Sequence, residues 1–367
     1  MNEWTSRFPD TIDSHVHMGD IEQEAELEQI RQAIGVDRIG LVAIQNPAAG
    51  SGLPQALYMK ARQPRRYYVF AGLNHAAQLS AGQVQTAPLE QQVERFVDMG
   101  CDGIKMIEGK PTSRQRMDIP VDDPYFAAFW RTVEALDLPI VWHVNDPEEF
   151  WDPATTPVWA LERNWGYGPE DVTKEQLYAE VDAVLQRHQD LRIVFAHFYF
   201  LSADLPRAQR FLDAHPRVAF DLTPGIEMLY NLSRDVEATR DFFLRYADRI
   251  LFGTDIFSDL SVREGQYRAG IVYRWLESDD MFRVPAGADF LLGQPADGEI
   301  HGLALPDEVL TRIYRSNFTA RAGDEPRPLN VDAAIEECRR LAEIAAGLSA
   351  TPAGQTLAAR VATSLAE

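Results

Sequence analysis

Two histidines separated by a single residue are the first side chains of the sequence that could do metal chemistry. His15 and His17 lie in Thr11–Met18, a segment whose apolar and β-branched residues predict a strand. Because alternate residues of a strand point to the same side, both imidazoles are expected to face one direction. Neutral imidazole is a good ligand for zinc and neighbouring divalent metals. The pair alone also fits two surface histidines, so its interpretation depends on the rest of the chain.

Further polar side chains fall near the ends of other apolar segments. His143 follows PIVW, His197 follows RIVFA, and Asp255 follows LFGT. A polar or charged side chain inside an apolar strand is costly unless it is paired or bound to a metal. The alternative, several unrelated buried histidines and a buried aspartate at one height, requires many coincidences. The pattern therefore predicts one polar site where these strands end.

Eight short apolar segments, most of them followed by a helical pattern, are expected to position these side chains. The predicted strands are Thr11–Met18, Arg38–Asn46, Tyr67–His75, Asp102–Glu108, Pro139–Asn145, Arg192–Tyr199, Val218–Pro224 and Arg249–Asp255. This alternation is typical of an α/β fold, the (β/α)₈ TIM barrel, whose sites lie at the carboxyl ends of the strands. An open doubly wound sheet is the competing topology, but no GxGxxG or GxxxxGK[ST] motif follows the first strand.

The chain is expected to form one large domain with a helical extension. Residues 1–325 are assigned to the barrel and residues 326–367 to a C-terminal helical tail, packed on the barrel or at a subunit contact. The stretch RAGDEPRPLN is typical of a linker between the two. The segment Asp280–Pro306 is predicted to be mainly loop.

Composition narrows the class of protein. The 367 residues include 35 Lys and Arg against 56 Asp and Glu, a net charge of −21, which argues against a nucleic acid or an anionic membrane as partner. The two cysteines, Cys101 and Cys338, form no CxxC pattern, which fits a reducing cytoplasm. The beginning of the chain lacks the layout of a signal peptide. We expect a cytoplasmic enzyme for a small-molecule substrate, with a homodimer as one option for its assembly.

The combined pattern resembles the amidohydrolase superfamily of metal-dependent barrels. The TIDSHVH opening, the LFGTD strand and the SNFTAR segment resemble its amidohydrolase-2 branch, which includes aminocarboxymuconate-semialdehyde decarboxylase. The resemblance spans about Ile12 to Ala320. It implies that one divalent ion, most often Zn²⁺ and otherwise Mn²⁺, is held by His15, His17, His143 and Asp255. It further implies that His197 acts beside the metal as general acid and base, with Asp255 as a second catalytic group.

Two reactions and one inactive alternative fit this constellation. The first hypothesis is hydrolysis, in which metal-activated water attacks an amide, ester or lactone-type carbonyl. The second is the non-oxidative decarboxylation of an unsaturated or aromatic acid, which uses nearly the same groups. The third is a catalytically inactive barrel that serves as a binding protein. Every ligand position that the resemblance implies is filled, which argues against the third.

Four side chains are candidates for substrate binding. Lys105 lies in a predicted strand, and apolar neighbours on both sides turn it inward. In other amidohydrolases a carboxylated lysine here bridges two metals, but the resemblance to the mononuclear branch favours a contact with a substrate carboxylate or a buried salt bridge. His75 ends the third predicted strand. Trp151 and Trp165 lie in the long loop Pro147–Pro169, which either covers the substrate or packs on the barrel rim.

Overall fold

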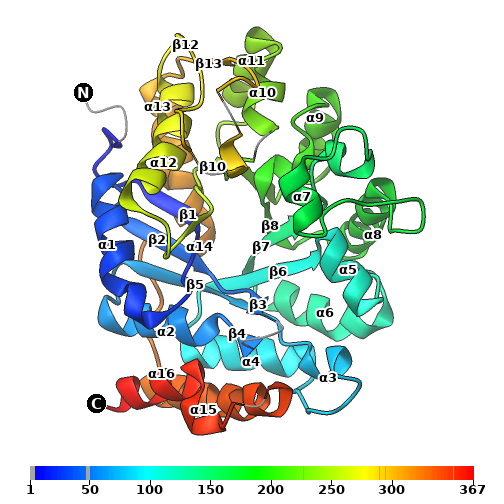
Figure 1. The fold of residues 1–367 in the computed structure, drawn as a ribbon, viewed down its shortest axis with the longest axis vertical. Coiled ribbons are helices and arrows are strands. Elements are labelled where there is room, and N and C mark those ends of the chain that lie inside the picture. The colour runs from blue at the N-terminus through cyan, green and yellow to red at the C-terminus, as the bar shows by residue number, and fades with distance from the viewer. Residues whose placement is uncertain (1–4, 47–49, 226, 289, 294, 350) are drawn as a thin grey trace.

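A ring of parallel strands surrounded by helices forms the centre of the protein (Figure 1). The computed structural model describes residues 5–46, 50–225, 227–288, 290–293, 295–349 and 351–367. Within them the strands of the ring are β1 Ile12–His17, β2 Arg38–Val42, β5 Tyr67–Gly72, β6 Gly103–Gly109, β7 Pro139–Val144, β8 Arg192–Phe195, β9 Val218–Asp221, β10 Ile250–Leu251 and β11 Ile256–Phe257. A short hairpin, β3 Gln45–Asn46 and β4 Gly50–Ser51, lies outside the ring.

The ring closes through the segment that ends the predicted barrel. The strands are hydrogen-bonded in the order β10-β9-β8-β7-β6-β5-β2-β1-β11. β10 and β11 belong to one segment, residues 250–257, yet they stand at the two ends of this order, pairing with β9 and β1. The Ser14 amide also donates to the Phe252 carbonyl, at 3.0 Å. The fold is therefore the TIM barrel that the sequence predicts.

Helices cover the outside of the ring. They are α1 Glu24–Ala33, α2 Leu53–Arg62, α3 Ala76–Leu79, α4 Leu89–Met99, α5 Pro111–Met117, α6 Ala127–Ala135, α7 Val158–Glu162, α8 Lys174–Arg187, α9 Leu205–Ala214, α10 Met228–Leu232, α11 Val236–Arg245, α12 Val262–Glu277, α13 Asp307–Thr311 and α14 Asn317–Ala322. Asp, Ser or Thr side chains accept a backbone N–H at the first turn of α8, α9, α11 and α12. In α4, the apolar residues Leu89, Val93, Phe96 and Met99 recur every three or four positions and are buried.

The lower half of the barrel interior is a packed apolar core. Alternate strand residues such as Val141 and Ala219 meet there, and Phe318 of α14 closes the end. Two positions further along the same strands come His143 and Asp221, so the same alternation that buries the apolar layer aims polar groups at the layer above. The interior is thus divided into an apolar floor and a polar upper level.

Several predicted boundaries were wrong. β8 ends at Phe195, four residues before the predicted end, because the backbone turns into a left-handed conformation at His197. Of the eighth predicted strand, Arg249–Asp255, only β10 forms within the predicted bounds, and β11 begins one residue after its predicted end. Helix α12 has no counterpart in the prediction. The described residues of Asp280–Pro306 are mainly loop, as predicted, and include the short antiparallel pair β12 Met281–Phe282 and β13 Ile300–His301.

Two helices follow the barrel in the chain, α15 Val331–Leu348 and α16 Leu357–Ala366. They contact each other and pack on α2 and α4, below the ring in Figure 1. The division of the chain near residue 325 and a role of these helices in a dimer stay predictions. Among the described residues, no helix combines the length and the apolar character that a membrane crossing requires.

The Asn317 amide joins the start of α14 to the end of the barrel. Its Nδ2 donates to the carbonyls of Ala247 and Ile250, at 2.8 and 2.7 Å, and the side chain is buried. Asn317→Leu should lower the free energy of unfolding by about 2–4 kcal/mol, since two buried carbonyls lose their donor. Urea denaturation followed by circular dichroism measures the change. Thr319→Ala on the same helix is the control; equal stability of both variants would contradict this role.

Candidate active site

Backbone irregularities at the carboxyl ends of the strands bring the predicted site residues together. The β1–β2 register shifts between Asp13 and Val16, the stretch that contains His15, and both His15 and His17 line the cavity. Asp255 has a φ of 54° and interrupts the eighth strand. His197 through Phe200 all have positive φ, between 51° and 56°. Such conformations are rare for residues other than glycine and cluster at functional sites.

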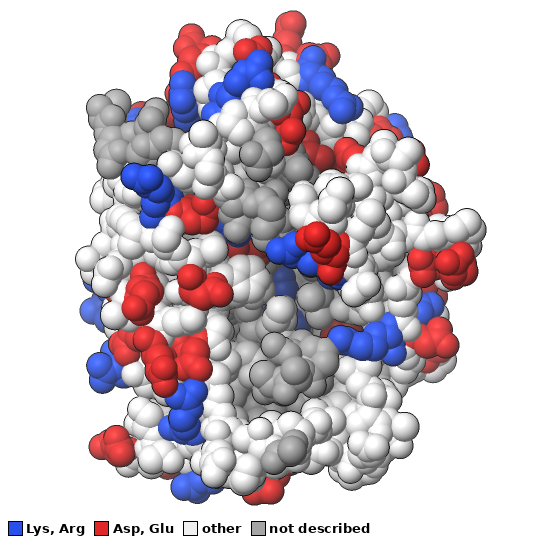
Figure 2. Space-filling model, in the orientation of Figure 1, with Lys and Arg blue, Asp and Glu red and all other residues white. Residues whose placement is uncertain are grey.

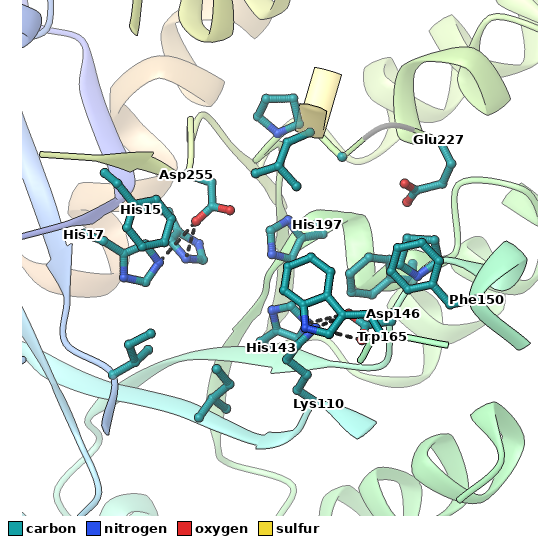
Figure 3. A pocket seen from close by; sticks show the side chains of 18 of the residues that line it. His15, His17, Lys110, His143, Asp146, Phe150, Trp165, His197, Glu227 and Asp255 are labelled. Carbon is teal, nitrogen blue, oxygen red and sulfur yellow. Dashed lines mark hydrogen bonds and ion pairs between the residues drawn. The ribbon is translucent and has the colours of Figure 1, made fainter. Parts of the chain in front are cut away.

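A cavity of about 250 Å³ lies above the apolar floor of the barrel. His15, His17, Lys105, His143, His197 and Asp255 line it, and the side chains labelled in Figure 3 converge on the same space. Apolar side chains form much of the remaining wall: Ile44, Ile107, Phe150, Trp159, Trp165, Phe200 and Phe257. The face of the molecule drawn in Figure 2 has a hollow near its centre, with acidic and basic side chains interspersed around it. Polar groups suited to chemistry are therefore enclosed by apolar walls.

Three of the four predicted metal ligands form one buried cluster. One ligand atom each of His15, His17 and Asp255 lies within 4.8 Å of the others. Asp255 Oδ1 is 3.2 Å from His17 Nε2 and 3.6 Å from His15 Nε2. Burial alone would raise the pKa of Asp255, but the hydrogen bond from His17 and the nearby imidazoles outweigh it and hold the pKa well below its usual range. Two imidazoles and one ionised carboxylate fit a Zn²⁺- or Mn²⁺-type ion.

Asp221, at the end of β9, fixes the tautomer of His15. Its Oδ2 accepts a hydrogen bond from His15 Nδ1 at 2.9 Å, which leaves Nε2 facing Asp255. A carboxylate behind a histidine in this way orients the ring and makes its other nitrogen a better metal ligand. Burial, followed by the charge of Lys105, lowers the pKa of His15 to about 4, although Asp221 and Asp255 act in the opposite direction. The imidazole is therefore neutral near pH 7, the form in which it binds metals.

His197 is held by a second set of contacts to the same strand end. Its Nδ1 lies 2.9 Å from Thr223 Oγ1, and this hydroxyl donates to Asp221 Oδ1 at 2.5 Å. Because the hydroxyl proton is used for Asp221, Nδ1 must donate to Thr223, which leaves Nε2 as the basic nitrogen. Burial, followed by the neighbouring His143, lowers the pKa of His197 to about 4. The role of this imidazole in proton transfer stays a prediction.

His143 stands apart from the three clustered ligands. Its Nε2 donates to the Asn145 carbonyl at 3.0 Å and approaches Asp146 Oδ1 at 3.3 Å. Asp146 Oδ1 also accepts a hydrogen bond from Lys110 Nζ at 2.5 Å, and the same Nζ lies 4.4 Å from the centroid of the Trp165 ring. The His143 ring packs against that of His197, with centroids 4.8 Å apart. The assignment of His143 as a fourth ligand stays a prediction.

Lys105 points into the cavity beside the clustered ligands. Its Nζ lies 3.0 Å from His15 Nε2, and the side chain is 3 % exposed. Burial lowers the pKa of the ammonium to about 8, although Asp255 and Asp221 act in the opposite direction. Among the described residues, His15, His17 and Asp255 form the candidate metal-binding cluster, with Lys105 next to it.

A comparison with known protein families bears on this geometry. The family model described as Amidohydrolase, of the amidohydrolase-2 type, matches residues 12–318. The chain belongs to the amidohydrolase-2 family. Metal-dependent enzymes are typical of this family, and the His/His/Asp cluster is the candidate metal site of this chain. No curated protein matches the chain.

Solved structures of other proteins have the same barrel fold as this chain. The 2,6-dihydroxybenzoate decarboxylase from Rhizobium matches with a TM-score of 0.51 and 15% identity, over 86% of this chain and 98% of that chain. A structure named Amidohydrolase II matches with a TM-score of 0.51 and 12% identity, over 86% and 100%. A complex of 2,6-dihydroxybenzoate decarboxylase with 2,6-dihydroxybenzoate matches with a TM-score of 0.50 and 14% identity, over 86% of this chain and 99% of that chain. At these identities the likeness shows the fold.

Two of the four predicted substrate-binding residues of this chain line the cavity, and two do not. Lys105 and Trp165 line the cavity. His75 lies elsewhere: its Nε2 is 2.8 Å from Glu108 Oε1, and its Nδ1 is 3.0 Å from the Tyr125 hydroxyl. Trp151 packs on Tyr167, with centroids 4.6 Å apart, and donates to the Val172 carbonyl. The structure therefore brings two of these four side chains to the site.

Sequence reasoning missed other parts of the site. Asp221 ends an apolar strand, the signal that singled out Asp255, and could have been found in the same way. Thr223 contacts His197 and Asp221, and a threonine in the sequence carries no signal for such contacts. Glu227 lines the cavity from a loop with no periodic pattern, so nothing in the sequence marks it.

The cluster predicts which histidine holds the metal. His15→Ala should remove most of the bound metal from protein purified without chelators, because one of three clustered ligand atoms and the carboxylate-oriented ring are lost. Elemental analysis of the purified variant measures the metal-to-protein ratio. His75→Gln is the matched control, since this histidine is equally buried but outside the cavity. Full metal occupancy in His15→Ala would rule out the assignment.

Proposed function

We propose that the protein is a metal-dependent carboxy-lyase that removes CO₂ non-oxidatively from a small aromatic or unsaturated acid. The observation that carries this proposal is the cavity itself. A buried cation, Lys105, and the His/His/Asp cluster lie at one place in a space whose other walls are largely apolar and aromatic. Such a space suits a flat organic acid whose carboxylate meets the polar end.

His15, His17 and Asp255 would hold the divalent ion, with His143 as the proposed fourth ligand, and one ion per chain is expected. Zn²⁺ is the leading candidate and Mn²⁺ the alternative, because both accept nitrogen and carboxylate donors. The bound ion would supply Lewis-acid stabilisation of negative charge that develops on the substrate. Every other task falls to side chains of the chain itself.

The apolar walls favour decarboxylation for an electrostatic reason. A carboxylate concentrates its charge on two oxygens, whereas the charge left after loss of CO₂ spreads over the unsaturated system. Walls such as Phe150, Trp165 and Phe200 exclude water and so penalise the concentrated charge more than the dispersed one. The Lys105 ammonium orients the acid at the polar end. Hydrolysis, the first hypothesis from the sequence, would instead need water inside this cavity at the scissile carbonyl.

The substrate carbon must gain a proton when CO₂ leaves. His197 is the proposed donor, because Thr223 and Asp221 hold its ring with Nε2 available to the cavity. Because burial lowers its pKa to about 4, the ring is neutral near pH 7 and would pass on a proton that Nε2 first takes up from solvent water; the imidazolium formed in this way is a strong acid that releases the proton readily to the substrate carbon. Asp255 is the second proposed catalytic group, and its low pKa keeps it ionised, the form that binds a divalent ion and accepts hydrogen bonds.

The shared fold with 2,6-dihydroxybenzoate decarboxylase supports the choice of acids to test. Protein loaded with Zn²⁺ or Mn²⁺ is incubated with carboxyl-¹³C hydroxybenzoates, and labelled CO₂ and bicarbonate are measured. In deuterated water the product should carry deuterium at the former carboxyl position. A parallel panel of esters, lactones and amides is followed for acid release. Acid release without labelled CO₂ from any carboxylic acid would favour the hydrolase instead.

The roles of two cavity residues can be separated by metal content. His197→Asn should keep near-normal metal content and lower kcat by roughly 10²–10⁴-fold, the usual contribution of a positioned acid or base. His15→Ala should lose metal and activity together. If His197→Asn loses metal as readily as His15→Ala, then His197 is a ligand.

Lys105 gives a second test of the one-ion assignment. Lys105→Met should retain one metal per chain and raise KM for the acid substrate, because the cation that orients the carboxylate is gone. Elemental analysis and steady-state kinetics measure the two effects. Two metals per wild-type chain, both lost in Lys105→Met, would show a carboxylated bridging lysine instead.

A further inference from the structure

One acidic side chain in the cavity has no task in the proposed reaction. Glu227 precedes α10, and its side chain belongs to the lining of the cavity together with Phe150, Trp165 and Phe200. Figure 3 shows its carboxylate turned toward the space bounded by His197 and Phe150, across the cavity from His15, His17 and Asp255. It therefore stands on the side of the cavity away from the candidate metal ligands.

The Glu227 carboxylate is buried without a hydrogen-bond partner on any other described residue. The residue is 8 % exposed, and within the described part of the chain neither of its oxygens hydrogen-bonds another residue. Buried carboxylates are expected to be paired or hydrogen-bonded, because removing them from water costs several kcal/mol otherwise. The other buried carboxylates of the cavity follow this rule: Asp146 is paired with Lys110, and Asp255 with His17. Glu227 is the exception that calls for a ligand.

The surrounding backbone leaves room for this carboxylate. Gly225 also lines the cavity, and a Cβ atom at this position would lie 2.9 Å from Glu227 Oε2. The absence of a side chain at residue 225 is thus what lets the carboxylate rest against the cavity wall. The pKa of Glu227 is raised to about 7, chiefly by burial; a hydrogen bond from its own backbone N–H opposes the rise, as does Lys174, while Glu149 and Asp146 add to it. Both the ionised and the neutral form are accessible near neutral pH, and each can accept a hydrogen bond.

We propose that Glu227 is a specificity-determining residue that binds a hydroxyl group of the substrate, on the side of the molecule away from the reacting carboxylate. The inference rests on the proposed function for the position of that carboxylate beside Lys105. The substrate class is then a hydroxylated aromatic or unsaturated acid rather than a purely apolar one. An unsubstituted acid leaves Glu227 buried and unpaired in the complex, and a site built for a hydroxyl rejects the analogue that lacks it.

Equilibrium binding tests this inference without catalysis. Metal-loaded protein is titrated with benzoate, 3-hydroxybenzoate and 4-hydroxybenzoate, using isothermal calorimetry and tryptophan fluorescence, since Trp159 and Trp165 line the cavity. Wild-type protein should bind at least one hydroxybenzoate about 10- to 100-fold more tightly than benzoate, the range for a hydrogen bond to a charged group. Glu227→Leu should abolish this preference while benzoate binding changes less than about threefold, an effect smaller than one lost hydrogen bond. Glu227→Gln, whose amide oxygen still accepts, should keep part of the preference.

Glu149→Gln is the matched control, because this carboxylate lies close to Glu227 but does not line the cavity. It should leave the preference for the hydroxylated acid unchanged. A preference that persists in Glu227→Leu, or equal binding of all three acids to the wild type, would overturn the inference.

The stability of the ligand-free protein gives a second, independent readout. The folded-state pKa of Glu227 is raised, so its ionisation opposes folding at pH values above that of an unfolded-chain glutamate, and the full penalty is present above pH 7. At pH 8, Glu227→Gln should therefore raise Tm by about 1–3 °C, and at pH 5 by less. A fall in Tm for both Glu227→Gln and Glu227→Leu would show a structural role and overturn the inference.

The two proposals fail in different ways. If hydroxybenzoates bind with the expected Glu227-dependent preference but no acid releases CO₂, the carboxy-lyase is wrong and the role of Glu227 stands. If CO₂ is released and the Glu227 variants keep the wild-type preference, the carboxy-lyase stands and the role of Glu227 is wrong. If no acid binds and the Glu227 variants lower Tm, both are wrong.

Discussion

One fully buried carboxylate, that of Asp221, constrains both imidazoles on which the candidate chemistry depends. Its Oδ2 accepts from His15 Nδ1, while its Oδ1 accepts from the His197 backbone N–H and the Thr223 hydroxyl. Because a buried carboxylate needs partners for its lone pairs, these contacts are a condition of folding as well as of function. Each of them removes a degree of freedom at the site: the His15 tautomer, the position of the His197 backbone and the proton of Thr223.

The strained backbone beside Asp221 is the structural cost of this arrangement. Residues 197–200 adopt left-handed conformations, which cost roughly 1–2 kcal/mol each for residues other than glycine. Aromatic packing offsets this cost. The Phe198 ring lies 5.1 Å from that of Phe220, and the Tyr199 ring stacks on Phe195 at 4.1 Å, all of them fully buried. The large apolar residues that follow His197 in the sequence thus hold the turn that aims this imidazole into the cavity.

Periodicity explains what could be predicted from the sequence and what could not. The barrel and the inward direction of His143 follow from alternation along strands, a local property. The hydrogen bond that turns His143 Nε2 away from the clustered ligands is a tertiary contact and leaves no pattern. Helix α12 was missed because Gly265, Gly270 and the buried Arg268 interrupt its apolar periodicity. Glu227 lies in a loop, where only the folded chain reveals its burial.

The contact between Lys105 and His15 links the charge state of the cavity to metal binding. His15 Nδ1 is committed to Asp221, so Nε2 has a single lone pair, and Lys105 Nζ donates to it at 3.0 Å. That lone pair serves either the ammonium or a metal ion, and never both at once. A divalent ion held by the cluster would therefore displace Lys105 from His15, and repulsion between the two cations would favour an anionic partner for the ammonium elsewhere in the cavity. The carboxylate of the proposed acid substrate would meet this demand, so one buried hydrogen bond would couple the loading of the site with metal to its affinity for an acid.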